Sequence, residues 1–145
     1  MKKFDFKLDQ VRGWTETRLR MEDVTLEALV HELRRLDEEF AHQSAQCADF
    51  GRQVHQQEFI DSVSLATLSE FRRFLIRERA RVDRTRPALE ARIENQRQLI
   101  TEIKRKIALF DKLKDTQYRT WRLEADREMQ ELADESFAAR STRER

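Results

Sequence analysis

The chain has 145 residues, of which 39% are apolar and 39% are charged, and it contains only two glycines, one proline and one cysteine. This composition is typical of long helices and coiled coils, because a compact globule needs more apolar residues to fill its interior. The balance of 29 basic and 28 acidic residues argues against a protein that mainly binds nucleic acid or an anionic membrane.

Other classes are also disfavoured by the sequence. No apolar run approaches the ~20 residues of a membrane span, and the basic N-terminus is not followed by the apolar run of a secretory signal. A single cysteine allows no internal disulfide, which fits a reducing compartment. We therefore expect a cytoplasmic, all-α protein.

The first predicted helix carries a heptad repeat. Steps of three and four residues alternate along Leu26, Leu29, Leu33, Leu36, Phe40, Gln43, Cys47, Phe50 and Val54. These are the a and d positions of a coiled-coil seam, and only Gln43 breaks its apolar character. Upstream, the same register gives a mixed seam of Leu8, Arg12, Thr15, Leu19 and Glu22. The pattern predicts one helix over about residues 7–58.

The turn is predicted over about residues 59–66. Asp61, Ser62 and Ser64 have side chains that bond nearby backbone groups and favour turns and caps. Ser64 is a candidate N-cap for the next helix, and Thr67 with Glu70 forms an alternative capping box.

The second predicted helix, over about residues 65–139, has a seam that changes register once. The first part consists of Leu68, Phe71, Leu75, Glu78, Val82, Thr85 and Leu89, and the second part of Ile93, Gln96, Ile100, Ile103, Ile107, Phe110, Lys114 and Gln117. Pro87 lies beside the slip and is expected either to kink this helix or to break it. Residues 140–145 are expected to fray.

Two such seams predict a single domain, a long antiparallel two-helix coiled-coil hairpin over residues 1–145 with the second helix longer. If the turn centres near residue 62, facing residues have numbers that sum to about 124. Leu36 would then lie near Leu89, and Phe40 near Arg84. An internal hairpin of this kind is expected to be a monomer on its own.

No catalytic, cofactor or metal site is predicted. His31, His42 and His55 are 11 and 13 residues apart, at least ~16 Å on one helix, which is too far to share an ion. Cys47 occupies an a position, where a small apolar thiol fits the seam. A Gly-rich phosphate loop and a nucleophile elbow are both missing from the sequence. We expect a protein that is not an enzyme.

Three groups of residues are candidate protein-binding surfaces. A basic docking face would consist of Arg72, Arg73, Arg77, Arg79 and Arg81. Apolar residues gather at the turn, namely Phe59, Ile60, Val63, Leu65, Phe74 and Ile76. At the opposite end we expect Phe4, Phe6, Leu8, Trp14, Tyr118 and Trp121 to converge. The alternative interpretation is structural: the arginines lie on a solvated helix face partly paired with acids of the first helix, with Asp37, Glu38 and Glu39 near Arg84 and Arg86, and the apolar residues pack locally.

The N-terminal stretch 4–11, FDFKLDQV, resembles the F-x-F-x-L-x-x-V/L signature of the FliJ proteins of the flagellar type III export apparatus. Residues 109–117 are similar to an L-x-x-L-K-x-x-Q-like segment of that family, and residues 127–135 to its acidic C-terminal tail. The resemblance covers essentially the whole chain. Trp14 and Pro87 depart from the family pattern.

The resemblance implies a stalk, similar to the gamma subunit of rotary ATPases, at the cytoplasmic face of the flagellar base and peripheral to the membrane. It implies an end that binds the hexameric export ATPase and promotes its assembly and activity, through Phe4, Phe6, Leu8, Val11, Tyr118 and Trp121. It implies a tip that binds the export gate membrane protein through Phe59, Ile60, Phe71 and Phe74. Substrate-specific export chaperones are further implied partners, and nucleic acid is not. The alternatives are a YscO-type injectisome stalk and a generic coiled-coil scaffold or adaptor.

Overall fold

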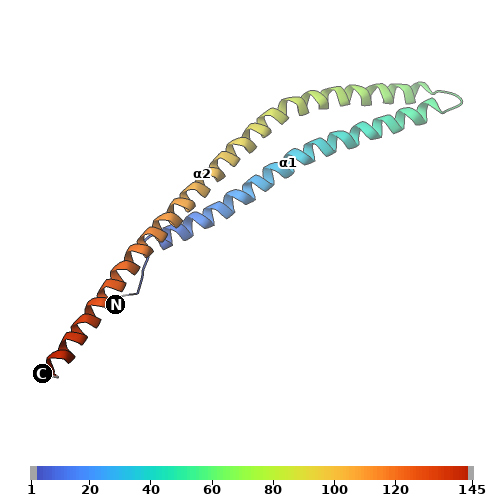
Figure 1. Ribbon diagram of the computed structural model, residues 1–145. Coiled ribbons are helices and arrows are strands. Elements are labelled where there is room, and N and C mark those ends of the chain that lie inside the picture. The colour runs from blue at the N-terminus through green and yellow to red at the C-terminus, as the bar shows by residue number, and fades with distance from the viewer. Residues whose placement is uncertain (1–2, 144–145) are drawn as a thin grey trace. The chain divides into compact units, whose positions relative to one another are not determined.

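The computed structural model describes residues 3–143 and contains two helices joined by a short turn (Figure 1). Helix α1 spans Asp9–His55, and helix α2 spans Ser62–Arg143. The described residues include no strand. The predicted all-α, two-helix antiparallel hairpin with a longer second helix is therefore confirmed.

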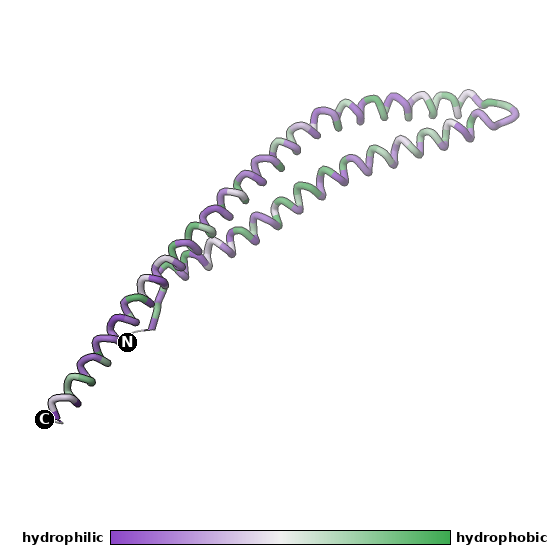
Figure 2. The backbone as a smooth tube through the Cα atoms, viewed as in Figure 1, coloured by the Kyte–Doolittle hydropathy of each residue, from purple (hydrophilic) through white to green (hydrophobic). Residues whose placement is uncertain are grey.

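Burial follows the heptad positions of both helices. In α1, every seam position from Leu26 to Val54 is buried or half-buried. In α2 the same holds for all predicted seam positions except Thr85 and Gln117, which are exposed. Figure 2 shows hydrophobic residues recurring at short intervals along both helices, separated by hydrophilic ones. Within residues 3–143 no polar or charged residue is buried, and all the buried hydrophobic residues except Phe6 and Ala125 occupy predicted seam positions.

The turn lies earlier in the chain than predicted, at residues 56–61 in place of 59–66. Neither Ser64 nor the Thr67 capping box begins α2. Asp61 is the N-cap, because its Oδ1 accepts a hydrogen bond from the backbone N–H of Val63 at 3.2 Å and its carbonyl accepts one from Leu65 at 3.1 Å. Thr67 instead donates its hydroxyl to the Val63 carbonyl at 2.9 Å. Asp61 is the first strong capping residue after α1, so α2 begins directly after it.

The helix ends also differ from the predictions. α1 begins at Asp9 and ends at His55, where 7 and 58 were expected. α2 continues to Arg143, so residues 140–143 are helical and not frayed; the end of that predicted tail, residues 144–145, lies outside the described residues. Hydroxyls of Ser141 and Thr142 donate to the Ala138 carbonyl, at 2.9 and 3.0 Å, within this last turn.

Pro87 does not break α2, since the helix is continuous from Ser62 to Arg143. Figure 1 shows α2 changing direction in its yellow-green stretch, the part of the colour range that holds Pro87. A proline within a helix removes one backbone hydrogen-bond donor and clashes with the preceding turn, which bends a helix without ending it. Of the two predicted outcomes, a kink or a break of the helix, the structure shows the kink.

The contacts divide the chain into two units. Unit 1 combines the residues up to Arg20 with those from Thr101 onward, and unit 2 spans Met21–Ile100. Each unit contains part of α1 and part of α2. The core of unit 2 includes a cluster of Leu29, Leu89 and Ile93, with Leu26, Val30 and Leu33 packed against it.

The pairing of helices in unit 2 partly follows the predicted register. Leu36 and Leu89 line one common groove, as expected. The ring of Phe40 lies 6.0 Å from the guanidinium carbon of Arg79, five residues before the Arg84 that was predicted as its neighbour. Because the turn is earlier than predicted, the α2 residues that face α1 near the turn have lower numbers than the predicted register gives. Further from the turn, Arg86 forms an ion pair with Asp37.

Candidate protein-binding surfaces

An aromatic cluster in unit 1 joins the segment before α1 to α2. The Phe4 ring centroid is 5.2 Å from that of Tyr118 in an edge-on arrangement, and 5.8 Å from that of Trp121. Tyr118 and Trp121 are one helical turn apart, and their rings stack at 5.7 Å. Tyr118 remains 41% exposed, so the cluster presents part of its aromatic surface to solvent. Three of the residues predicted at this end therefore form one contiguous surface, which we call the aromatic cluster.

Charged contacts lie beside the aromatic cluster. Lys114 Nζ donates to Asp9 Oδ1 at 2.9 Å and lies 5.8 Å from the centroid of the Phe6 ring. Arg12 Nε donates to Asp111 Oδ1 at 2.6 Å. The hydrogen bond from Lys114 holds the pKa of Asp9 below its ordinary value, and the hydrogen bond to Asp111 raises the pKa of Arg12. These pairs hold the N-terminal turns of α1 to α2.

The remaining residues predicted at this end have different roles. Phe6 is buried, Leu8 is half-buried, and Val11 is 38% exposed. The convergence expected for Trp14 is wrong, because its side chain is 66% exposed and no ring contact joins it to the others. The seam positions on either side of it belong to Arg12 and Thr15, which leaves Trp14 off the seam.

The apolar residues near the turn divide into an exposed set and a half-buried pair. Phe59 is 88% exposed and Ile60 is 48% exposed. Phe71 and Phe74 are half-buried, and their rings stack with centroids 6.3 Å apart. The exposed set also includes Val63, Leu65 and Ile76. Of the four residues predicted for the tip, only Phe59 and Ile60 offer a largely open surface.

The arginines of the predicted basic face do not share one face of α2. At 3.6 residues per turn, Arg73 and Arg77 lie opposite the seam, Arg72 and Arg79 border one edge of it, and Arg81 borders the other. All five are exposed.

Three of these arginines form ion pairs with acids on their own helix: Arg73 with Glu70, Arg79 with Asp83, and Arg81 with Glu78. The hydrogen bond to Glu78 raises the pKa of Arg81. Arg72 and Arg77 form no ion pair within residues 3–143.

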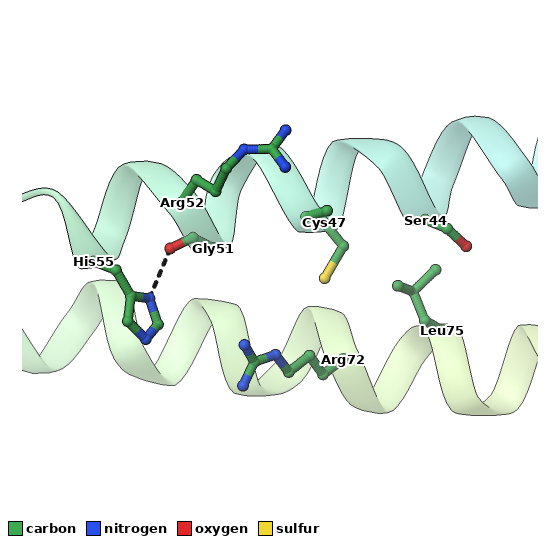
Figure 3. Close-up of a pocket in the computed structure, with 8 residues that line it drawn as sticks. Ser44, Cys47, Gly51, Arg52, His55, Arg72 and Leu75 are labelled. Atoms are coloured by element: carbon green, nitrogen blue, oxygen red, sulfur yellow. Dashed lines mark hydrogen bonds between the residues drawn. The ribbon is translucent and has the colours of Figure 1, made fainter.

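A shallow groove of about 510 Å³ near the turn was not predicted (Figure 3). Its α1 side consists of Ser44, Cys47, Ala48, Gly51, Arg52 and His55, and its α2 side of Arg72 and Leu75. Figure 3 shows the Cys47 sulfur directed toward α2, and His55 Nδ1 lies 2.7 Å from the Gly51 carbonyl oxygen. The small residues Ser44, Ala48 and Gly51 recur at helical spacing, which is the signal that could have predicted this groove.

In the part of the chain that the structure describes, no three His, Cys, Asp or Glu side chains gather in a way that could hold a metal ion. Neither helix, over the described residues, contains a stretch long and apolar enough to cross a membrane.

Comparisons with protein-family models, curated proteins and solved structures gave no match.

Proposed function

We propose that this chain is a non-enzymatic component of a flagellar type III export apparatus, located at the cytoplasmic face of the flagellar base. In this role it acts as a stalk that binds the hexameric export ATPase and promotes its assembly and activity. The observation that carries the proposal is the aromatic cluster. Phe4, from the N-terminal stretch that resembles the FliJ signature, packs against Tyr118 and Trp121 of α2.

The aromatic cluster has properties suited to gripping another protein. Tyrosine and tryptophan are enriched in binding surfaces because they combine a large apolar area with a polar atom. A partner that binds an assembled ring but not its free subunits shifts the equilibrium toward the ring by mass action. The proposed activity is therefore stabilisation of the ATPase hexamer through this cluster.

The turn supports a second contact in the same role. We assign the export gate protein to the open surface of Phe59 and Ile60. The half-buried pair Phe71 and Phe74 would support this surface from α2. The arginines from Arg72 to Arg81 would dock acidic partner surfaces, with export chaperones as the candidates.

The test measures ATP hydrolysis by the export ATPase of the same gene cluster, over a range of ATPase concentrations. The full chain should raise hydrolysis where hexamers are incomplete, and the stimulation should fade where the ATPase assembles alone. Replacing Tyr118 and Trp121 together with alanine should abolish the stimulation.

Trp14→Ala is the matched control, because it removes a 66% exposed tryptophan of the same unit that lies outside the cluster. Equal stimulation by the control and the cluster variant would place the ATPase contact elsewhere. No stimulation by the unaltered chain would favour the generic scaffold over the export stalk.

A further inference from the structure

Within residues 3–143, the last part of α2 has no other helix packed against it. Ala125 is 4% exposed and is the last buried residue of α2 in the described chain. From Asp126 to Arg143 every residue is exposed, over about 27 Å of helix. Figure 1 shows this red stretch extending past the N-terminal end of α1, which belongs to the same unit. Helices in water gain most of their stability from packing of an apolar face, so a partner that covers this stretch would stabilise it.

The exposed stretch is amphipathic. Steps of four and three residues lead from the buried Ala125 to Met129 and Leu132, the spacing of a and d positions in a heptad. Met129 is 60% exposed and Leu132 is 65% exposed. Ala133 and Phe137 follow Met129 at two further steps of four residues, and Phe137 is 75% exposed. These four exposed residues, Met129, Leu132, Ala133 and Phe137, lie side by side on the helix, and we call them the C-terminal apolar stripe.

Carboxylates line one edge of the C-terminal apolar stripe. Glu128 and Glu135 occupy the g positions of this heptad, and Glu124 and Glu131 lie next to them, further from the stripe. All four are exposed, and within residues 3–143 none of them forms an ion pair. From residue 121 to residue 136 the helix carries six acidic and two basic residues.

This charge determines which partner fits the stripe. Charges at g positions select a partner helix by forming ion pairs across the seam, so glutamates there favour a helix with lysine or arginine along its own seam. A second copy of the same stretch would bring two acidic segments together, and like charges repel. The charge of this edge therefore points to a different protein with a basic edge.

We propose that the C-terminal apolar stripe is the docking site for a helix of another protein, whose own apolar stripe is flanked by lysine or arginine. The partner helix would take, along this stretch, the place that α1 has along α2 elsewhere in unit 1. Apolar contacts with Met129 and Leu132 would supply most of the affinity, and Glu128 and Glu135 would select the basic partner. This surface is separate from the aromatic cluster, and the inference does not depend on the proposed role in export.

The experiment measures the binding of two labelled synthetic peptides to the full chain by fluorescence anisotropy. Both peptides are about three heptads long, with leucine at a and d, and are used at concentrations too low for pairing with themselves. The lysine peptide has lysine at its e and g positions, and the glutamine peptide has glutamine there. The lysine peptide should bind about tenfold more tightly, and this difference should shrink when the salt rises from about 0.05 M to about 0.5 M.

Two leucines of the same segment provide matched variants. Leu132 and Leu123 are nine residues apart, two and a half turns, so they lie on opposite sides of the helix. Their exposed fractions are similar, 65% and 62%. Leu132→Gln should weaken binding of the lysine peptide about tenfold, and Leu123→Gln should leave it unchanged. Circular dichroism checks that both variants remain helical.

The glutamates are tested with both peptides. Glu128→Gln with Glu135→Gln should weaken binding of the lysine peptide and leave binding of the glutamine peptide unchanged, because only the first loses ion pairs. Hydrogen exchange then locates the contact. Backbone amides of residues 126–143 should exchange rapidly in the chain alone and slowly when the lysine peptide is bound.

Several results would overturn the proposal. The lysine peptide does not bind, or binds no more tightly than the glutamine peptide. The Leu132 and Leu123 variants bind it equally well. Protection from exchange appears outside the stretch. A fourth result is that the chain alone has twice its single-chain mass in sedimentation equilibrium and Leu132→Gln restores the single-chain mass, because the occupant would then be a second copy.

Discussion

The two units use the same two helices but are held together by different interactions. Of the twelve buried hydrophobic residues in the described chain, nine lie between Met21 and Ile100, in unit 2, and three lie in unit 1. Three of the four aromatic ring pairs belong to unit 1. Two ion pairs join α1 to α2 there, from Arg12 to Asp111 and from Lys114 to Asp9.

This difference predicts different responses to solution conditions. Apolar burial is non-directional and involves no titrating group, whereas exposed ion pairs respond to pH and are screened by salt. Both tryptophans of the chain, Trp14 and Trp121, lie in unit 1. Tryptophan fluorescence therefore reports on unit 1 alone, while circular dichroism reports on both units.

The largest effect is expected from Leu89→Ala in unit 2. Leu89 is 4% exposed and packs with Leu29 and Ile93, so its truncation removes apolar contacts and leaves a cavity. The variant should lower the free energy of unfolding by about 2–3 kcal/mol, at the lower end for such changes because a two-helix seam can relax around the cavity. Chemical denaturation followed by circular dichroism measures this loss.

Leu123→Ala is the control for that variant, since it truncates a leucine that is 62% exposed. It should change the free energy of unfolding by less than about 0.5 kcal/mol. Equal losses for the two variants would contradict the assignment of the unit 2 core.

An intermediate effect is expected from acid, and it should appear in unit 1. Because Lys114 holds the pKa of Asp9 below its ordinary value, Asp9 contributes stability that is present above the unfolded value of about 4. That contribution is lost as the pH falls further, through the folded pKa. The melting temperature of unit 1, measured by tryptophan fluorescence, should therefore decrease as the pH is lowered through this range.

Asp9→Asn should reduce the acid sensitivity of the fluorescence transition and lower the melting temperature slightly at neutral pH. Asp126→Asn serves as control, because Asp126 is exposed and has no ion pair among the described residues. If both variants keep the full acid response, other carboxylates determine the pH dependence.

The smallest effect is expected from Gly13→Ala. A Cβ at this position would meet no atom within 4 Å, and alanine favours a helix over glycine by up to about 1 kcal/mol. The melting temperature seen by tryptophan fluorescence should therefore rise slightly. Gly51→Ala provides a comparison in unit 2, where the nearest atom would be Leu68 Cδ1 at the ordinary contact distance of 3.6 Å. A decrease for Gly13→Ala would show that its backbone is not helical in solution.

The candidate surfaces could be predicted only in part. The pairing of Phe4 with Tyr118 and Trp121 followed from the N-terminal signature and the hairpin topology. The exposure of Trp14 was missed although the predicted register already assigned the neighbouring seam positions to Arg12 and Thr15, which leaves Trp14 beside the seam. The groove beside Cys47 was missed although Ser44, Ala48 and Gly51 recur at helical spacing in α1, because its other side is formed by Arg72 and Leu75 of α2, which only the tertiary structure places there.

The sequence by itself determined that this protein is two long helices, and which side of each is buried. Heptad spacing is a local property, so Leu29, Leu36, Val54 and the other seam residues could be identified without coordinates. Only the tertiary structure decided the register between the helices and the separation into two units. Those features depend on where Asp61 caps α2 and on contacts between residues about a hundred positions apart, such as Arg12 and Asp111, which no local spacing encodes.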